Sequence, residues 1–448
     1  FDIFKAFDKT SVNFITQVME RMNFGQKFIS YIKACHTDIT TQFILGNLSR
    51  QLKVLISLRQ GDPIAMALFL INIEPLLVYL RDKISGLTVG GASQKDEDFV
   101  DDISAASIDL EDMVKLNHAF MHFEGVSGTV LNRTSKTKVM GLGGWTNRNV
   151  WPLSWVRTVP SLRIFGLQFY PTVQDTIKAS WDTCKTGINN CLQSWSSRTL
   201  PTLSQRVQII NTFALSKLWY LAQVLPIPQG VINDLEKLIR SFLWLGRMEK
   251  LPYEELVSPT NAGGLGLVNI SSKCDALLIT QICRVLSHRG PYREHLKYWF
   301  GVSLRAYLPD LLAGPNAEIL TPYFRKVVNL LKEVFSSDLV DPQRLELVKA
   351  KYLYLELIST PPPPKVMYNN PGFNWSVIWK RLEDPMISPQ GKDILFSILH
   401  NIYRNKQRLF RMNQHPTGNC DVCRGQEESN LHLFTGCQRS QGTWFYTK

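Results

Sequence analysis

An acidic doublet is the feature that most restricts how this chain can fold. Phe99, Val100, Asp101 and Asp102 place two adjacent carboxylates after a short apolar run, a pattern that predicts a strand ending in a polar turn. Asp2 lies near the start of the chain in a second run of aromatic and β-branched residues. A fold that brings Asp2 beside the doublet would create a site for a hard divalent cation, which prefers carboxylate oxygens. The competing interpretation is an ordinary polar surface turn.

Composition favours a globular protein with a polyanionic partner. Of the 448 residues, 44% are apolar, which is enough for packed cores in several domains. The 50 Lys and Arg residues against 38 Asp and Glu give a formal charge of +12, as expected for a protein that binds nucleic acid. Five scattered cysteines are typical of reduced core thiols in an intracellular protein: Cys35, Cys184, Cys191, Cys274 and Cys283. The apolar run 64–80 contains Asn72 and Glu74, so we interpret it as a buried helix rather than a membrane span.

Periodicity and turn residues predict an α+β domain over residues 1–172. The expected elements are a strand over 1–4, helices over 5–22 and 28–36, a hairpin of 39–45 with 51–56 around Gly46–Asn47, and a helix that starts at Pro63 with Asp62 as its cap and ends near residue 81. Strands 87–89 and 98–105 are expected to pair, with the acidic doublet at the turn. From residue 173 the pattern becomes helical, and the prolines at 361–364 predict an extended linker.

These runs, in this order, resemble the motifs of reverse transcriptases, most of all those of non-LTR (LINE-type) retrotransposons. Phe1-Asp2 with Lys5-Ala6-Phe7-Asp8 is similar to motif A, Gln60-Gly61-Asp62-Pro63 to motif B, Phe99-Val100-Asp101-Asp102 to motif C, Asn132 with 136–141 to motif D, and 162–166 to the primer grip of motif E. Where the family usually has Tyr-Ala-Asp-Asp, this chain has Phe99 and Val100. The chain starts at motif A, so we expect a fragment that lacks the fingers.

The resemblance implies a right-hand polymerase architecture. We expect a palm of antiparallel sheet and helices over 1–172, a helical thumb over 173–270, a helical connection over 271–360, a proline linker with basic helices over 361–411 and a zinc knuckle over 412–448. It also implies an RNA template, a DNA primer, deoxynucleoside triphosphates and element RNA as partners, in a ribonucleoprotein of cytoplasm and nucleus without membrane association.

The resemblance also implies roles for individual residues. Asp2 and Asp101 would bridge two Mg²⁺ ions, with Asp102 in support. Lys136 would protonate the leaving pyrophosphate, with Lys138 as the competing candidate. The amide of Ala6, the ring of Phe7, and Gln60 with Gly61 would contact the incoming nucleotide. Phe7 would exclude a ribose 2′-hydroxyl; the alternative is a core phenylalanine at the start of a helix.

Four residues near the C-terminus have the spacing of a structural zinc site. Cys420, Cys423, His432 and Cys437 form C-x2-C-x8-H-x4-C, and three thiolates with one imidazole complete a closed tetrahedral Zn²⁺ site. His415 is a competing ligand with less suitable spacing. Non-LTR retrotransposon proteins often carry a CCHC knuckle downstream of the polymerase, so the resemblance extends to this segment.

A basic stretch precedes the cysteine cluster. Its cations are Arg404, Lys406, Arg408 and Arg411, interleaved with Tyr403 and Phe410. Cations for phosphates and rings for base stacking predict a nucleic-acid contact; the alternative is a solvated helix face.

Two hypotheses follow from the sequence. The first is a fragment of an RNA-directed DNA polymerase. The second is a truncated, catalytically inactive element copy that acts only as a zinc-dependent nucleic-acid-binding protein. A group II intron-like or domesticated relative is a lesser rival, which the CCHC segment disfavours.

Overall fold

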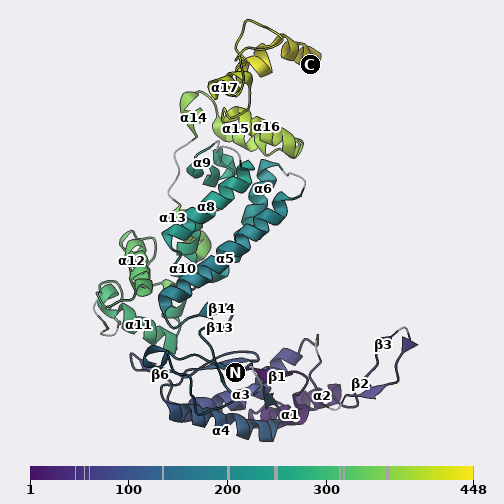
Figure 1. Cartoon of the computed structure of the whole chain (residues 1–448), viewed down its shortest axis with the longest axis vertical. Coiled ribbons are helices and arrows are strands. Elements are labelled where there is room, and N and C mark those ends of the chain that lie inside the picture. Colours follow the sequence, from purple (N-terminus) through teal and green to yellow (C-terminus); the bar gives the residue numbers. More distant parts are fainter. Residues whose placement is uncertain are drawn as a thin grey trace. The chain divides into compact units, whose positions relative to one another are not determined.

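The structure is a computed structural model that describes residues 1–448 apart from 46, 55, 60, 134, 135, 199–201, 247–250, 312, 313, 316, 317, 359–363, 447 and 448. Its helices and short strands make a mixed α+β protein (Figure 1). The chain forms two compact units: unit 1 comprises Phe1–Ser180 and Arg284–Lys332, and unit 2 comprises Trp181–Cys283 and Glu333–Lys448. The predicted connection region 271–360 is therefore divided between the two units.

Unit 1 alternates short strands with helices. Its strands are β1 (Ile3–Phe4), β2 (Thr40–Thr41), β3 (Ile44–Leu45), β4 (Asn47–Leu48), β5 (Leu52–Lys53), β6 (Leu87–Val89), β7 (Ala92–Gln94), β8 (Asp96–Phe99), β9 (Asp102–Ala105), β10 (Val130–Leu131), β11 (Lys138–Val139), β12 (Arg157–Thr158), β13 (Leu162–Ile164) and β14 (Leu167–Phe169). Its helices are α1 (Val12–Arg21), α2 (Gln26–Cys35), α3 (Ala65–Lys83), α4 (Leu110–Ser127), α11 (Pro291–Leu304) and the 3-10 helix η1 (Gly143–Trp145). The unit boundaries fall inside α5 (Val173–Ser196), α10 (Ile270–Ser287) and α12 (Pro322–Ser336).

The strands of unit 1 pair two by two, and one further bridge connects two of the pairs. β1 is antiparallel to β10, β8 is antiparallel to β9, and an antiparallel bridge joins Asp2 to Asp102. The resulting strand order is β10, β1, β9, β8. β11 and β12 form a separate pair, and they are parallel.

The predicted pairing of 87–89 with 98–105 was wrong. β6 pairs instead with β7, and the register of Val89 with Ala92 leaves Gly90 and Gly91 as a two-residue turn. Both glycines have positive φ, +61° and +81°, the conformation that favours this tight hairpin turn. The local glycine turn therefore closes β6 onto β7, and residues 96–105 form a separate hairpin.

The core of unit 1 packs helices α1, α3 and α4 against the central strands. Ile15, Phe69 and Phe120 are almost fully buried, in one cluster with Ile3 of β1 and Ile103 of β9. Burying side chains of this size contributes roughly 1.5–3 kcal/mol each. Successive strand residues face opposite sides, so the inward Ile3 and Ile103 place Asp2 and Asp102 on the outward face.

Two predicted helix starts were too early. α1 begins at Val12, because Lys5 adopts a left-handed φ of +47° and Ser11 caps the helix by accepting from the amide of Phe14. α3 begins at Ala65 rather than Pro63, and the Asp62 carboxylate accepts a hydrogen bond from the amide of Ile64 at 3.1 Å. The apolar run 64–80 does form a core helix, α3, which lies alongside α4 (Figure 1).

Unit 2 is helical. It contains α6 (Leu203–Ile209), the π-helix η2 (Ile210–Ala214), α7 (Ser216–Ala222), α8 (Gln229–Trp244), α9 (Tyr253–Val257), η3 (Thr260–Ala262), η4 (Leu345–Leu347), α13 (Ala350–Leu357), α14 (Lys365–Asn369), α15 (Trp375–Leu382), α16 (Pro389–Leu399), α17 (Lys406–Arg411), η5 (His432–Gly436) and α18 (Gln438–Tyr446). Within the described ranges, no helix of the protein has the length and apolar character to cross a membrane. Three prolines of the predicted linker, 361–363, lie outside the described residues.

A glycine loop organises unit 2. A Cβ atom on Gly264 would lie 1.9 Å from the carbonyl oxygen of Ser258, and one on Gly263 would lie 2.7 Å from the ring of Trp379. His400 Nε2 also lies 2.7 Å from the carbonyl oxygen of Gly263. Trp379 of α15 and His400, which follows α16, therefore pack against a backbone that leaves no room for side chains.

Candidate catalytic and metal sites

The acidic doublet lies in a tight hairpin. The register of β8 with β9 pairs Phe99 with Asp102, so Val100 and Asp101 form a two-residue turn. Val100 has a φ of +61°, which is a genuine outlier for a β-branched residue. Such a conformation costs about 1–3 kcal/mol and persists only where the surrounding structure imposes it. The hairpin thus presents Asp101 and Asp102, both exposed, through a strained turn.

Asp2 lies directly opposite Asp102 in the sheet. The two residues form an antiparallel bridge, and the backbone nitrogen of Phe1 donates to the carbonyl oxygen of Ile103 at 2.7 Å. Opposed residues of antiparallel strands project from the same face, with Cβ atoms roughly 4.5–5.5 Å apart. The fold therefore brings together two of the three predicted acids, and the third, Asp101, is the next residue along the turn.

Two polar side chains from the segment after β10 contact Asp2. Asn132 Nδ2 donates to Asp2 Oδ2 at 2.9 Å, and the Asn132 amide donates to the Asp2 carbonyl oxygen at 2.8 Å. Lys136 Nζ lies 3.9 Å from the same Oδ2. The competing Lys138 is in β11, where it is the partner of Arg157. Of the two candidate lysines, Lys136 is thus the one beside Asp2.

The residues expected to contact the nucleotide differ in burial, packing and backbone conformation. Ala6 is buried, and its carbonyl oxygen accepts from Thr10 Oγ1 at 2.7 Å. The ring of Phe7 stacks on Phe69, with centroids 5.1 Å apart, and packs against the core, so the Phe7 setting agrees with both sequence interpretations. Gly61 has a φ of +86°, which favours glycine. Gln60 lies outside the described residues.

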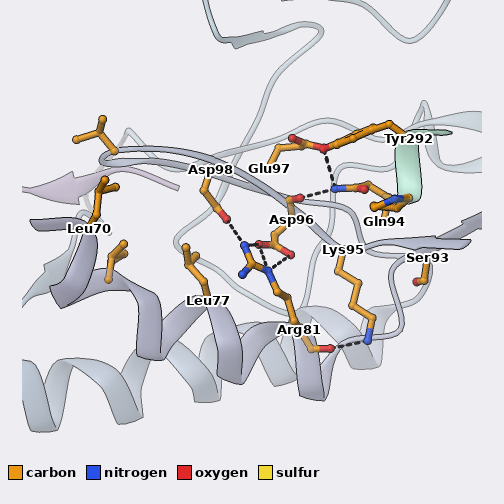
Figure 2. Close-up of a pocket in the computed structure, with 13 residues that line it drawn as sticks. Leu70, Leu77, Arg81, Ser93, Gln94, Lys95, Asp96, Glu97, Asp98 and Tyr292 are labelled. Atoms are coloured by element: carbon orange, nitrogen blue, oxygen red, sulfur yellow. Dashed lines mark hydrogen bonds and ion pairs between the residues drawn. The ribbon is translucent and has the colours of Figure 1, made fainter. Parts of the chain in front are cut away.

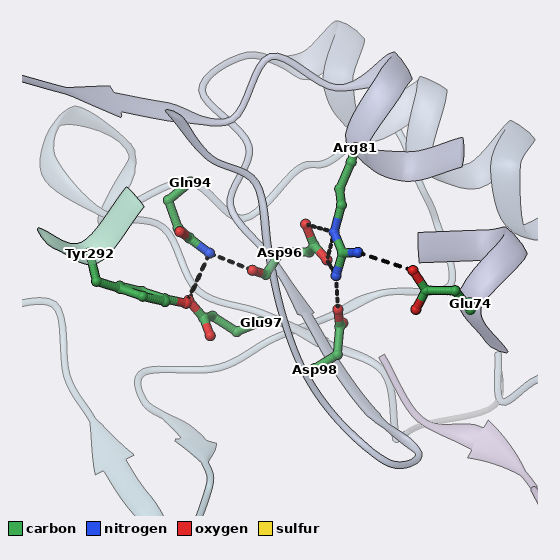
Figure 3. Close-up of polar contacts among 7 residues, drawn as sticks. All are labelled: Glu74, Arg81, Gln94, Asp96, Glu97, Asp98 and Tyr292. Carbon is green, nitrogen blue, oxygen red and sulfur yellow. Dashed lines mark hydrogen bonds and ion pairs between the residues drawn. The ribbon is translucent and has the colours of Figure 1, made fainter. Parts of the chain in front are cut away.

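A charge cluster supports the strand that leads to the doublet. Arg81 of α3 donates through Nε to both carboxylate oxygens of Asp96, at 3.1 and 2.8 Å, and its Nη2 lies 3.2 Å from Asp98 Oδ2 (Figure 3). Burial raises the pKa of Asp98 to about 8, and the neighbouring Asp96 carboxyl adds to the effect. Arg81 therefore ties β8 to the end of α3.

A cavity of about 620 Å³ lies beside this cluster (Figure 2). Leu70 and Leu77 of α3 line it together with Tyr292 of α11. Gln94 donates to Tyr292 Oη at 3.1 Å and to Glu97 Oε1 at 2.7 Å. This network connects residues of α11 to β7 and β8, a contact that no sequence pattern indicated.

The segment predicted to be the primer grip is also a hairpin. β13 pairs with β14, and Ile164 opposite Leu167 leaves Phe165 and Gly166 at the turn. Their φ values are +48° and +81°, as a two-residue hairpin turn requires. The predicted motifs A, C and E thus all lie on short antiparallel strands of unit 1.

The zinc motif forms a compact set of ligands. Of the Cys, His, Asp and Glu side chains that the structure describes, Cys420, Cys423, His432 and Cys437 are the group of three or more whose ligand atoms all lie within 4.8 Å of one another. The three predicted magnesium ligands do not form such a group, and His415 is not part of it.

The distances in this group fit tetrahedral zinc. Cys437 Sγ lies 3.8 Å from the sulfur atoms of both Cys420 and Cys423, and Zn–S bonds of about 2.3 Å place sulfurs roughly 3.8 Å apart. Among the described residues, Nε2 of the buried His432 has no hydrogen-bond partner, which metal ligation would explain. A hydrogen bond from the Arg439 backbone lowers the pKa of Cys437 and so favours the thiolate that zinc requires.

The four basic residues before the cysteine cluster fall into two groups, one with partners within the protein and one without. Lys406 pairs with Asp421, and Arg408 donates to the carbonyl oxygen of Asn401. Arg404 and Arg411 are exposed, and within the described part of the chain neither side chain has a hydrogen-bond or ion-pair partner. Arg404 and Arg411 are therefore free to contact a ligand.

Comparison with known proteins points to a transposon. No protein-family model matches the chain. The chain is 23% identical over 299 residues to the Transposon TX1 uncharacterized 149 kDa protein of Xenopus laevis. The match covers 63% of this chain and 22% of that protein, so the chain spans about a fifth of the length of its relative. The chain is similar to a transposon protein.

Proposed function

We propose that this chain is part of an RNA-directed DNA polymerase of a non-LTR retrotransposon. The observation that carries the proposal is the bridge between Asp2 and Asp102. Two-metal nucleotidyl transfer needs carboxylates from separate segments side by side, and this bridge joins acids from the two predicted motifs. The similarity to a transposon protein supports the same class.

The candidate acids have the ligand chemistry of a magnesium site. Their carboxylate oxygens suit Mg²⁺, which keeps water and substrate phosphates among its ligands. Among the described residues Asp2 Oδ1 accepts no hydrogen bond, so one oxygen of Asp2 is available to a cation. Asp2 and Asp101 would hold two Mg²⁺ ions, with Asp102 in support. When bound, the ions stabilise charge on the attacking and leaving oxygens.

The remaining predicted residues would handle the substrates. Lys136, beside Asp2, would give its proton to the pyrophosphate as the deoxynucleotide joins the DNA primer on its RNA template. Phe7 would exclude a 2′-hydroxyl with a ring held by Phe69, while the Ala6 amide, Gln60 and Gly61 would contact the triphosphate. Element RNA would be the bound template in the ribonucleoprotein.

Primer extension tests this proposal. The assay uses the chain with an RNA template, a DNA primer, deoxynucleoside triphosphates and Mg²⁺. Asp101→Ala should abolish extension, whereas Asp38→Ala should not, because Asp38 is an exposed partner of Lys53. Equal activity of Asp101→Ala and the parent would refute the assigned site.

A second candidate is a binding protein without polymerase activity. The compact Cys3His group and the two free arginines favour it. We expect the double change Arg404→Ala with Arg411→Ala to weaken RNA binding and to lower the salt dependence by about one unit of slope for each phosphate that is no longer neutralised. Lys406→Ala is the matched control, since Lys406 is paired with Asp421.

RNA binding by fluorescence anisotropy at several salt concentrations, with and without a zinc chelator, measures this effect. Affinity that is unaffected by both zinc removal and replacement of the two arginines would exclude the binding-protein candidate.

A further inference from the structure

Asn132 is a buried polar residue in contact with the candidate active site. It is 6% exposed, and it contacts Asp2 through both its side chain and its backbone, at 2.9 and 2.8 Å. The resemblance to motif D includes Asn132 but assigns it no role. The two hydrogen bonds give it one.

We propose that Asn132 is a positioning residue that fixes the orientation of the Asp2 carboxylate for metal binding. The inference rests on the proposed polymerase function and extends it to a residue outside the acidic set. Asn132 holds Oδ2 of Asp2, so the carboxylate presents its other oxygen to a divalent cation.

The need for such an anchor follows from the sheet. Asp2 and Asp102 are directly opposed, and like charges in this position repel each other. Without a donor, the Asp2 carboxylate can rotate away from Asp102. A neutral amide prevents the rotation and leaves the negative charge that a cation needs. Lys136 is a poorer anchor, because it lies 3.9 Å away and its side chain is 67% exposed.

Asn132 is itself held in place from both sides. The amide of Leu131 donates to Glu124 Oε1 at 2.6 Å, and Arg133 Nη1 donates to the same oxygen at 2.8 Å. Thr137 Oγ1 donates to the carbonyl oxygen of Asn132 at 2.9 Å. The residues before and after Asn132 are thus anchored on α4, so that its amide is a rigid donor. Partners of this kind tune metal ligands by about 10–100-fold.

The test measures metal binding separately from polymerisation. Asn132→Leu preserves the shape and removes the donor, and Asn72→Leu is the matched control. Asn72 is a buried asparagine of unit 1 that donates to Thr129 Oγ1. Electron paramagnetic resonance of free Mn²⁺ gives the affinity of the whole chain for the ion, with Asp2→Ala defining the binding that depends on the site. Thermal unfolding verifies that each variant is folded.

We expect Asn132→Leu to weaken Mn²⁺ binding by about 10–100-fold and Asn72→Leu to change it less than twofold. In primer extension the loss should fall on kcat and be partly recovered at high Mn²⁺, with KM for the nucleotide unchanged. A folded Asn132→Leu variant that binds Mn²⁺ as the parent does would overturn the inference, as would a parent without Asp2-dependent binding. If the parent binds Mn²⁺ through Asp2, with an affinity that falls in Asn132→Leu, but extends no primer, the inference stands and the polymerase proposal fails.

Discussion

The ring of Phe99 meets the ring of Phe165 edge to face, with centroids 6.0 Å apart and an interplanar angle of 69°. Phe99 ends β8 just before the strained turn of the acidic doublet, and Phe165 begins the turn between β13 and β14. Phe99 is 66% exposed, so this contact joins two hairpins near the surface. It links the candidate catalytic hairpin to the predicted primer grip.

This contact should be measurable as a coupling energy. Aromatic pairs contribute about 0.5–1.5 kcal/mol beyond their buried area. Because Phe99 is exposed, we expect a coupling energy near the lower end of this range. Urea unfolding of Phe99→Ala, Phe165→Ala and the double variant gives the coupling. Phe4→Ala combined with Phe165→Ala is the control and should be additive within about 0.5 kcal/mol. Additivity of the Phe99 cycle would show that the rings do not touch in solution.

The Cys3His group should bind one zinc ion per chain. With Co²⁺ in its place, tetrahedral thiolate coordination should give intense visible absorption, which Cys437→Ser should abolish. Cys35→Ser and His415→Ala should retain it, since neither residue belongs to the group. Structural zinc binding is worth about 10–16 kcal/mol in small domains, so a strong chelator should be needed to remove the ion. Co²⁺ spectra unchanged in Cys437→Ser would contradict the assignment.

The stability of unit 1 should decrease as pH rises toward 8. Burial beside Asp96 raises the pKa of Asp98 to about 8, whereas an unfolded aspartate has a pKa of about 3.9. Between these values the folded state binds more protons than the unfolded state, so the free energy of unfolding falls with increasing pH. Arg81 and Glu97 also face the Asp98 carboxyl group, and Arg81 in turn pairs with Glu74.

Asp98→Asn should flatten that slope, because an amide does not titrate. Urea unfolding at a series of pH values from 5 to 9 measures how the free energy of unfolding depends on pH. Asp82→Asn, at an exposed aspartate beside Lys83, is the control. The same slope in Asp98→Asn and the parent would mean that another group is responsible.

Two glycines of unit 2 should respond to alanine with opposite signs. Gly264→Ala places a Cβ 1.9 Å from the Ser258 carbonyl oxygen, and overpacking of this kind typically costs about 1–3 kcal/mol. Gly230 is the second residue of α8, and a Cβ added to it would have nothing within 4 Å, so Gly230→Ala should stabilise by about 0.4–1 kcal/mol through a less flexible unfolded chain. Differential scanning calorimetry of both variants measures the effect. A neutral Gly264→Ala would show that the loop can move aside.

The meeting of Asp2 and Asp102 was anticipated from the apolar run beside each acid together with the resemblance to motifs A and C. Each acid is next to a residue, Ile3 or Ile103, that the core buries, and the two-residue period of strands then sets the direction of its side chain. The zinc ligands could also be predicted from the sequence, because their spacing alone restricts the coordination that they can form.

Contacts between distant polar side chains could not be predicted from the sequence in this way. The bonds from Asn132 to Asp2 and from Arg81 to Asp96 depend on how α3, α4 and the strands pack, and neither residue has a periodic signature. The β6 pairing was mispredicted because the Gly90–Gly91 turn closes a shorter loop than the predicted pairing required, and short loops cost less entropy to close.

Unit 1 is assembled from two stretches of sequence, with residues 284–332 returning to the segment that ends at Ser180. During synthesis on the ribosome, more than a hundred intervening residues, 181–283, emerge after residues 1–180 and before residues 284–332, which complete the unit. A nascent chain arrested between these stretches would leave the surface of β6 and β7 that α11 contacts uncovered, and expression boundaries drawn at the end of the strand-rich segment would divide one compact unit.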